Sequence, residues 1–413
     1  MTDTIFANAR IIDGSGAAAY AGHVRVSGER IAAVSRTPLP AGGARVVDCA
    51  GRTLMPGLIE AHGHPSFGDT ASLEALGEIP PEEHTLLAVR NARKLLDQGF
   101  TSLNSAAAAK PRLDVVLRNA IAAGHFPGPR MLAASPEMTV TGGLGDVRLR
   151  HLHRETFAIV CDGPEEFRRV SREMVREGVD TLKINPSGDE FVPVARAHQT
   201  VMTEAEIAAV CEEAMARGKR VAAHARSAGS VKLCLKHGVE IIFHATLADD
   251  EALAALEAAR GRVFVAPTIG ITIATLYEAG PWGITTEAAT AMGLKAELDS
   301  AIANMKALKR AGVRILPGGD YGFAWNPIGR NARDLEHFVT HLGFTPLEAI
   351  HAATALGGEI MMRGHELGQV KEGYLADLLL VDGDPSADIS ILQDAGRLAA
   401  IMQAGRFHKP PAP

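Results

Sequence analysis

Cysteine is scarce in this chain of 413 residues. The four cysteines, Cys49, Cys161, Cys211 and Cys234, are far apart and form no Cys-x-x-Cys pair. This spacing excludes a disulfide framework and a cysteine zinc knuckle. It is typical of free thiols in a reducing compartment, and we therefore expect a cytoplasmic protein.

Aromatic residues are also few, and basic residues are outnumbered by acidic ones. Phe, Trp and Tyr make up 5% of the chain, and 42 basic residues face 48 acidic ones, which gives a formal net charge of −6. A nucleic-acid-binding protein would need a basic patch, so we expect no nucleic-acid partner. No apolar run reaches the length of a membrane span, and the first residues lack the basic and apolar regions of a signal peptide. We expect no membrane partner, and a small molecule as the ligand.

Two common nucleotide-binding motifs are missing, because no Gly-x-Gly-x-x-Gly follows a first strand and no P-loop occurs. What is present is an alternation of short apolar segments and longer helical patterns between residues 58 and 365. Eight strands with crossovers of this kind predict an α/β fold, a (β/α)8 TIM barrel over 58–365. The expected strands are 58–61, 101–104, 130–134, 181–184, 221–223, 240–243, 263–266 and 314–316.

Both ends of the chain read differently from the middle. Residues 4–9, 22–27, 30–35 and 45–48 are short β-branched segments separated by Gly, Pro and Asp, and the pattern returns at 376–382 and 398–403. We predict a small β-sandwich domain built from 1–57 together with 366–413.

Polar side chains stand at the ends of several predicted barrel strands, where the active site of such a barrel lies. They are His62 and His64, Lys183, His224, His244 and Asp320. The spacing of His62 and His64 puts both imidazoles on one face of an extended strand, and neutral imidazole is a favoured metal ligand. The pattern predicts a metal cluster.

Lys183 is the unusual member of this set, because a protonated amine has no lone pair for a metal. A charged lysine on the apolar segment Thr181-Leu-Lys-Ile-Asn185 would also be costly to bury unpaired. Addition of CO2 to the neutral amine gives a carbamate, whose two oxygens can bridge two metals. We therefore expect Lys183 to be carboxylated.

The ligand series, in this order, resembles the binuclear metal-dependent amidohydrolase superfamily. The lead-in Leu54-Met-Pro-Gly-Leu-Ile-Glu-Ala-His-Gly-His64 is similar to that superfamily's first-strand signature, and 373–382 resembles its second-domain strand. The segments 139–146, 223–225, 243–245 and 265–268 resemble the prolidase-like subgroup, which includes Xaa-Pro and Xaa-Lys/Arg dipeptidases and ochratoxin-type amidases.

The resemblance implies two divalent metal ions. Zinc is expected because of the imidazole ligands, and manganese or cobalt could occupy the same set. His62, His64 and Asp320 would hold one ion, His224 and His244 the other, and Lys183 would bridge them. Asp320 would be the catalytic proton carrier for a metal-activated hydroxide that attacks a carbonyl.

Two positions depart from the subgroup's pattern. Leu144 stands where dipeptidase relatives have a substrate-contacting histidine, and Arg226 where they have a tyrosine that assists the carbonyl. We expect Leu144 and Arg226 to line the substrate pocket, together with His151 and His153 of the loop that follows the third strand. Tyr321 directly follows Asp320 and is expected in the pocket wall.

The predicted function is a metal-dependent amidohydrolase that cleaves a carbon–nitrogen bond of a small amide, an N-acyl amino acid or dipeptide-like compound. The same centre could act on a lactone, carbamate, urea or phosphoester. A mononuclear deaminase is disfavoured, because such enzymes carry a His-x-x-Glu motif after the fifth strand. Here Ser227, three residues after His224, stands in the place of the glutamate. A non-catalytic scaffold is disfavoured by the intact ligand set. We expect a homo-oligomer.

Overall fold

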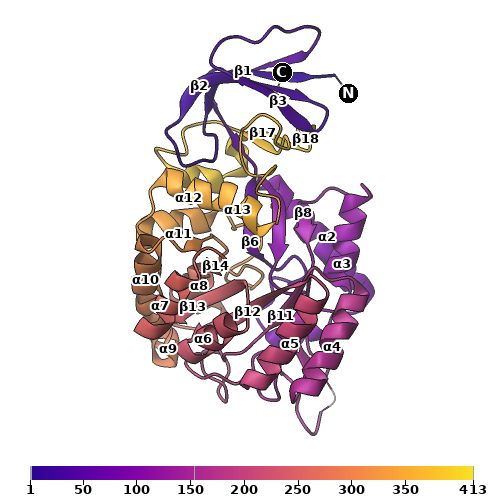
Figure 1. The fold of residues 1–413 in the computed structure, drawn as a ribbon, viewed down its shortest axis with the longest axis vertical. Coiled ribbons are helices and arrows are strands. Elements are labelled where there is room, and N and C mark those ends of the chain that lie inside the picture. The colour runs from indigo at the N-terminus through magenta and orange to yellow at the C-terminus, as the bar shows by residue number, and fades with distance from the viewer. Residues whose placement is uncertain (1, 153, 413) are drawn as a thin grey trace.

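A computed structural model describes residues 2–152 and 154–412. The chain forms a large α/β body and a smaller β-rich part, which lies at the top of Figure 1 and contains both chain ends. The order of the elements along the large body follows the alternation seen in the sequence, because most of its buried apolar strands are followed by a helix.

The strands of the large body are parallel and, apart from the short edge strand β10, follow one another in space in chain order. Two sheets contain them, one with the order β6-β7-β8 and one with β10-β9-β11-β12-β13-β14-β15. The strands are β6 (Leu58–Gly63), β7 (Phe100–Ser105), β8 (Arg130–Leu132), β9 (Ala134–Thr139), β10 (Ile159–Val160), β11 (Thr181–Ile184), β12 (Arg220–Ser227), β13 (Ile241–Leu247), β14 (Phe264–Ala266) and β15 (Arg314–Ile315).

Both junctions between the two sheets are close. β8 and β9 are separated only by Ala133, whose carbonyl oxygen accepts hydrogen bonds from the backbone N–H groups of Asp180 and Thr181. Beyond β15 the backbone runs against β6, since a Cβ atom placed on Gly318 would lie 2.7 Å from the Cβ of His62. The fold is a parallel α/β fold of the TIM-barrel-like type, and it brings the carboxyl ends of the strands to one end of the body.

Helices surround these strands (Figure 1). They are α1 (Leu73–Glu78), α2 (Pro81–Asp97), α3 (Leu113–Ala122), α4 (Pro164–Glu177), α5 (Glu204–Ala216), α6 (Ala228–Lys236), α7 (Asp250–Ala258), α8 (Ile269–Tyr277), α9 (Thr286–Met292), α10 (Leu294–Arg310), α11 (Arg333–Leu342), α12 (Pro346–Ala353) and α13 (Ala355–Ile360). Short 3-10 turns lie at Gly280–Trp282, Ile389–Gln393 and Ala395–Arg397.

Local sequence explains where these helices begin, end and face, as α4 illustrates. Pro164 occupies the first turn, where its missing N–H costs nothing, and Gly178 ends the helix with a φ of +100°. Val170 and Met174, four residues apart, are buried against the body, whereas Arg172 between them is exposed. Within the described residues, we find no helix whose length and apolarity would allow it to span a bilayer.

The terminal segments pair with each other in one sheet of order β18-β17-β16-β5-β1-β2-β3, with β4 beside β1. Its strands are β1 (Thr4–Ile11), β2 (Tyr20–Ser27), β3 (Arg30–Ser35), β4 (Arg45–Asp48), β5 (Thr53–Pro56), β16 (Leu378–Val381), β17 (Leu398–Gln403) and β18 (Arg406–Lys409). The sheet curls, because Phe6 of β1 and Phe407 of β18 meet with ring centroids 6.0 Å apart. The pairing of the two chain ends follows the predicted pattern.

Candidate metal centre

The first histidine pair and the aspartate converge at the ends of β6 and β15. The Nε2 atoms of His62 and His64 lie 3.1 Å apart. Asp320 Oδ1 lies 3.4 Å from the first and 3.2 Å from the second. One donor atom from each residue falls within 4.8 Å of the others, and both imidazoles are almost fully buried. Nitrogen and oxygen donors that converge in this way could hold one metal ion.

Burial decides the charge of this group. It lowers the pKa of His62 to about 3, so that the imidazole is neutral and keeps a lone pair at ordinary pH. Burial alone would raise the pKa of Asp320, but the neighbouring imidazoles outweigh it and hold that pKa well below its usual range. His64 Nδ1 lies 3.1 Å from the carbonyl oxygen of Ala107, which fixes Nδ1 as the protonated nitrogen. Nε2 therefore carries the lone pair that a metal ion could bind.

The second histidine pair lies on the adjacent strands β12 and β13. The rings of His224 and His244 have centroids 4.2 Å apart, and both side chains are buried. His224 donates from Nε2 to the carbonyl oxygen of Gly188 at 3.1 Å, which leaves Nδ1 as its lone-pair nitrogen. His244 Nδ1 is hydrogen-bonded to the Thr268 hydroxyl, and its buried Nε2 has no partner among the described residues. Burial lowers the pKa of both imidazoles well below the usual range.

Lys183 lies inside the body between the two pairs. Its side chain is 1% exposed, and its Nζ lies 4.6 Å from the centre of the Phe243 ring, which in turn packs 4.1 Å from the His62 ring. Burial lowers the pKa of the Lys183 ammonium, which favours the neutral amine.

Backbone strain is concentrated at this end of the body. His244, Thr268 and Asp320 adopt positive φ angles of 77°, 54° and 59°. Non-glycine residues rarely occupy the left-handed region, and such positions persist where the surrounding structure fixes them, often at functional sites. Two of these residues are predicted ligands and the third orients one.

A cavity of about 530 Å³ opens above the predicted ligands, and all six of them line it. This volume lies in the range that is typical of small-molecule binding sites. The other groups in its wall are largely apolar, so that polar contacts are confined to the metal-ligand end and to a few charged side chains.

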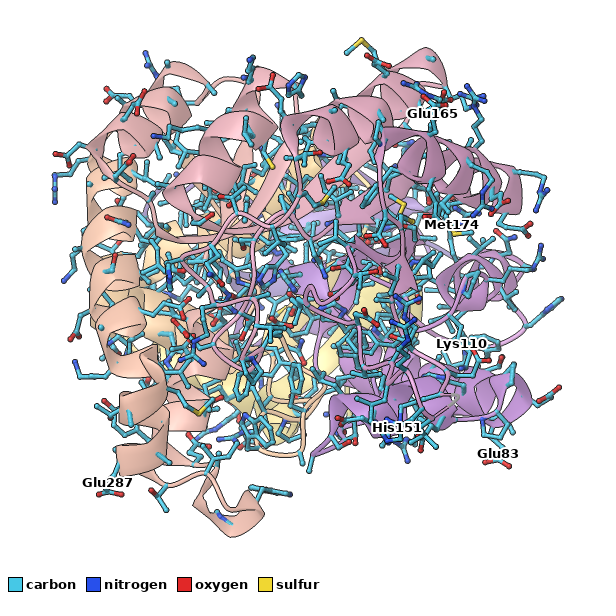
Figure 2. All side chains as sticks on the ribbon, turned by 90° about the horizontal axis from the view of Figure 1, so that it is seen from below. Glu83, Lys110, His151, Glu165, Met174 and Glu287 are labelled. Carbon is cyan, nitrogen blue, oxygen red and sulfur yellow. The ribbon has the colours of Figure 1, made fainter. Side chains whose placement is uncertain are left out.

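The structure separates the predicted substrate contacts. Leu144 and Arg226 line the cavity. Tyr321 does not, because its ring is 1% exposed and packs against Gly319, turned away from the cavity. His151 is exposed on the loop between β9 and β10 and lies outside the lining, on the face seen in Figure 2. His153 is outside the described residues.

Glu137 lines the cavity and was missed by the reasoning from sequence. The predicted third strand ended at Ala134, but the strand is interrupted only at Ala133 and β9 continues to Thr139. Glu137 therefore reaches the end of a strand, paired in register with Lys183, and it accepts a hydrogen bond from Asn185 at 2.7 Å. The signal in the sequence was the segment 135–139, which could have been assigned as a continuation of the third strand.

The donor chemistry fits divalent metal ions. Neutral imidazoles, one carboxylate and a buried nitrogen without a partner meet in one place, and other hydrogen bonds fix which nitrogen each ring offers. A purely structural cluster of this kind would leave several buried lone pairs unsatisfied.

Comparisons with known proteins agree with this geometry. The family model described as "Amidohydrolase family" matches residues 53–407. The ochratoxinase of Aspergillus niger is 27% identical over 87% of this chain and 76% of its own. An imidazolonepropionase of Rubrobacter xylanophilus is 26% identical over 94% of this chain and 91% of its own. A crystal structure of a prolidase complexed with N-methylphosphonate-L-proline superposes with a TM-score of 0.88 at 28% identity, covering 99% of this chain and 100% of that one. The chain thus belongs to the amidohydrolase family, metal-binding hydrolases of amide carbon–nitrogen bonds in small molecules.

Proposed function

We propose that the protein holds two divalent metal ions, most simply zinc, and uses them to hydrolyse a small amide. His62, His64 and Asp320 would hold one ion, and His224 and His244 the other. The observation that carries this proposal is the convergence of His62, His64 and Asp320 within 4.8 Å at the floor of the cavity. When bound, such ions polarise a carbonyl oxygen and lower the pKa of a water molecule.

Lys183 is proposed to bridge the ions as a carbamate. CO2 forms a C–N bond with the neutral amine and one N–H proton is released, so that a neutral group becomes an anion with two oxygen donors. The position of Lys183 between the histidine pairs and its burial support this change. A lysine that stayed protonated there would oppose the binding of cations.

Asp320 is proposed to carry the proton. Its carboxylate faces His62 and His64 and also lines the cavity, so that one group touches both the ligand set and the space for the substrate. Because its pKa is held below the usual range, it is ionised and can accept the proton of the attacking water. It would then deliver this proton to the leaving nitrogen.

The remaining expectations from sequence belong to the same proposal. The scissile bond is that of a small amide, a class that includes N-acyl amino acids and dipeptides. The four cysteines are buried and free, which suits a reducing cytoplasm. We also propose that the protein is a homo-oligomer and that the terminal strands, from 1–57 and 366–413, form a separate domain of sandwich type.

The test uses a panel of matched amides, carbamates, ureas and lactones. Protein loaded with zinc, manganese or cobalt should hydrolyse amides, and dialysis against a chelator should abolish this activity until metal is restored. Undiminished amide hydrolysis by metal-free protein would contradict the proposal. Selective hydrolysis of lactones or ureas would retain the metal centre but reject the amide as its substrate.

A further inference from the structure

A row of aromatic rings runs from the metal centre along one wall of the cavity. The Phe67 ring stacks on the imidazole of His64 with centroids 3.9 Å apart and an interplanar angle of 15°. Phe323 meets Phe67 edge-on at 6.0 Å, and Trp325 stacks beside Phe323 at 5.9 Å. Phe191 continues the row 6.3 Å from Trp325. The rings of all four apolar residues line the cavity.

This concentration is unusual for a chain with 13 phenylalanines and two tryptophans among 413 residues. Trp325 is held in place, because its indole N–H donates to the Thr275 hydroxyl at 2.9 Å. Phe157 adds a fifth cavity-lining ring, edge-on to Phe67 at 5.9 Å. Rigid aromatic walls favour flat apolar ligands, because stacked and edge-on ring pairs attract each other beyond the burial of apolar area.

The cavity's buried arginine is already neutralised. Arg226 Nη2 lies 2.9 Å from Asp189 Oδ2, and its Nη1 pairs with Glu297, which also accepts a hydrogen bond from the Thr246 hydroxyl at 2.7 Å. Both carboxylates are buried. A substrate carboxylate brought to this guanidinium would be the third anion around one cation, so Arg226 is a poor carboxylate anchor.

The arginines near the cavity mouth are paired as well. Arg148 binds Asp146 through two nitrogens, at 2.7 Å and 3.2 Å. Arg154 lies 3.4 Å from Glu78, with Glu74 as a further carboxylate partner. Lys183, the other cation in the described lining, would become an anion as a carbamate. Each arginine that lines the described cavity therefore already has a carboxylate partner.

We propose that this site recognises its substrate through an aromatic or similarly flat apolar group, and that it needs no carboxylate on the substrate. The inference rests on the proposed function and narrows it to small aryl-bearing amides, charged or neutral. The ring would lie against Phe67, Phe323 and Trp325, with the scissile bond at the metal end of the row.

The first test varies ring and charge independently. The four substrates are N-(3-phenylpropanoyl)glycine, its glycinamide, and the two corresponding N-butanoyl compounds, assayed with the metal-loaded protein. We expect the ring to raise kcat/KM at least 10-fold and the loss of the carboxylate to change it by less than 3-fold. A carboxylate effect as large as the ring effect, or larger, would overturn the proposal.

Substitutions locate the effect on the wall. Trp325→Leu should lower kcat/KM at least 10-fold for the phenylpropanoyl compounds and by less than 3-fold for the butanoyl ones, and Phe323→Leu should act in the same direction. Trp282→Leu is the matched control, because Trp282 is 44% exposed and lies 6.3 Å from Trp325 but outside the cavity lining. Equal losses for both substrate types in the two wall variants, which remain folded, would overturn the proposal.

A binding measurement separates this proposal from the proposed function. Trp282→Phe leaves Trp325 as the sole tryptophan, so fluorescence of the metal-loaded variant can be titrated with 3-phenylpropan-1-ol, a neutral ligand that is not hydrolysed. Saturable quenching, which n-butanol does not produce, is expected even if none of the amides is cleaved. Amide hydrolysis without such quenching would overturn the aromatic site while leaving the hydrolase intact.

Discussion

The two halves of the ligand set are built differently. At the His62 half, three donors already face one another, with contacts of 3.1–3.4 Å between side chains from β6 and the segment after β15. At the His224 half, each ring is set by a partner outside the pair, the carbonyl of Gly188 for one and the hydroxyl of Thr268 for the other. The first half is assembled mainly by strand geometry, with the Ala107 carbonyl orienting the ring of His64, whereas both rings of the second half are oriented by partners outside the pair.

This difference predicts different sensitivities. The His62 half should bind metal even if one surrounding hydrogen bond is lost, because a His-x-His pair on one strand faces one way by construction. The His224 half should depend on the groups that select the donor nitrogen. Lys183, between the halves, should affect both.

The largest effect is expected at the His62 half. Asp320→Asn retains the shape of the side chain but removes the basic carboxylate, and kcat should fall by about 10²- to 10⁴-fold. Most of the metal should stay, since both histidines remain. Steady-state kinetics together with elemental analysis checks this, and near-normal turnover would exclude Asp320 as the proton carrier.

Lys183→Ala tests the connection between the halves. Loss of the bridge should lower activity by about 10²-fold and release metal, while the fold remains, because the substitution removes a charge rather than a packed apolar side chain. Acetate or propionate should restore part of the activity in Lys183→Ala, where space is vacated, and none in Lys183→Gln. Full activity of the alanine variant without added acid would contradict the bridge.

Thr268→Val tests the ring orientation at the His224 half. Removal of the hydroxyl leaves His244 free to change tautomer, and the affinity for one of two ions should fall by about 10- to 100-fold. Thr268→Ser keeps the hydroxyl and serves as the control. Competition with a chromophoric chelator measures both ions, and equal weakening of the two would show that the halves are not independent.

The smallest effect is expected on folding stability, at Asp334, which holds the Gly318 backbone that packs against His62. Asp334 accepts a hydrogen bond from the Gly318 backbone at 2.8 Å, and burial raises its pKa to about 7. The folded state then keeps a proton that the unfolded chain releases near pH 4, so stability from this group falls as pH rises from about 4 to 7.

Asp334→Asn should remove the fall in stability that Asp334 causes as pH rises, because an amide does not titrate in this range. Metal-free Asp334→Asn should gain stability relative to the unsubstituted protein between pH 5 and pH 8, by a few kcal/mol at most on the scale of about 1.4 kcal/mol per pKa unit. Urea unfolding at several pH values measures this, with the exposed Asp299→Asn as the control. A relative stability that does not change with pH would contradict the raised pKa.

Much of the fold was predictable, because buried strands and their helices obey local rules. The expected strands at residues 58–61, 101–104 and 181–184 correspond to β6, β7 and β11. The third expected strand, 130–134, contains β8 but ends where β9 begins, because the strand is interrupted at Ala133, whose carbonyl oxygen accepts hydrogen bonds from Asp180 and Thr181. The ligand residues could be predicted because they stand at the carboxyl ends of strands, and a barrel brings these ends together on one side.

The walls of the cavity could not be predicted in the same way. The pairing of Arg226 with Asp189 and Glu297 joins a strand, a loop and a helix separated by many residues. The aromatic row likewise depends on loops whose side-chain directions are set by packing. Sequence spacing indicated Tyr321 as a wall residue, but the chain turns its ring toward Gly319.

Metal content of the purified protein is the most direct test of the central claim, a centre of two ions held by unlike halves. Protein prepared without chelator and saturated with zinc should contain close to two ions per chain by elemental analysis. His64→Ala and His244→Ala should each reduce this content toward one. Fully active protein with almost no divalent metal, or unchanged content in both variants, would contradict the account.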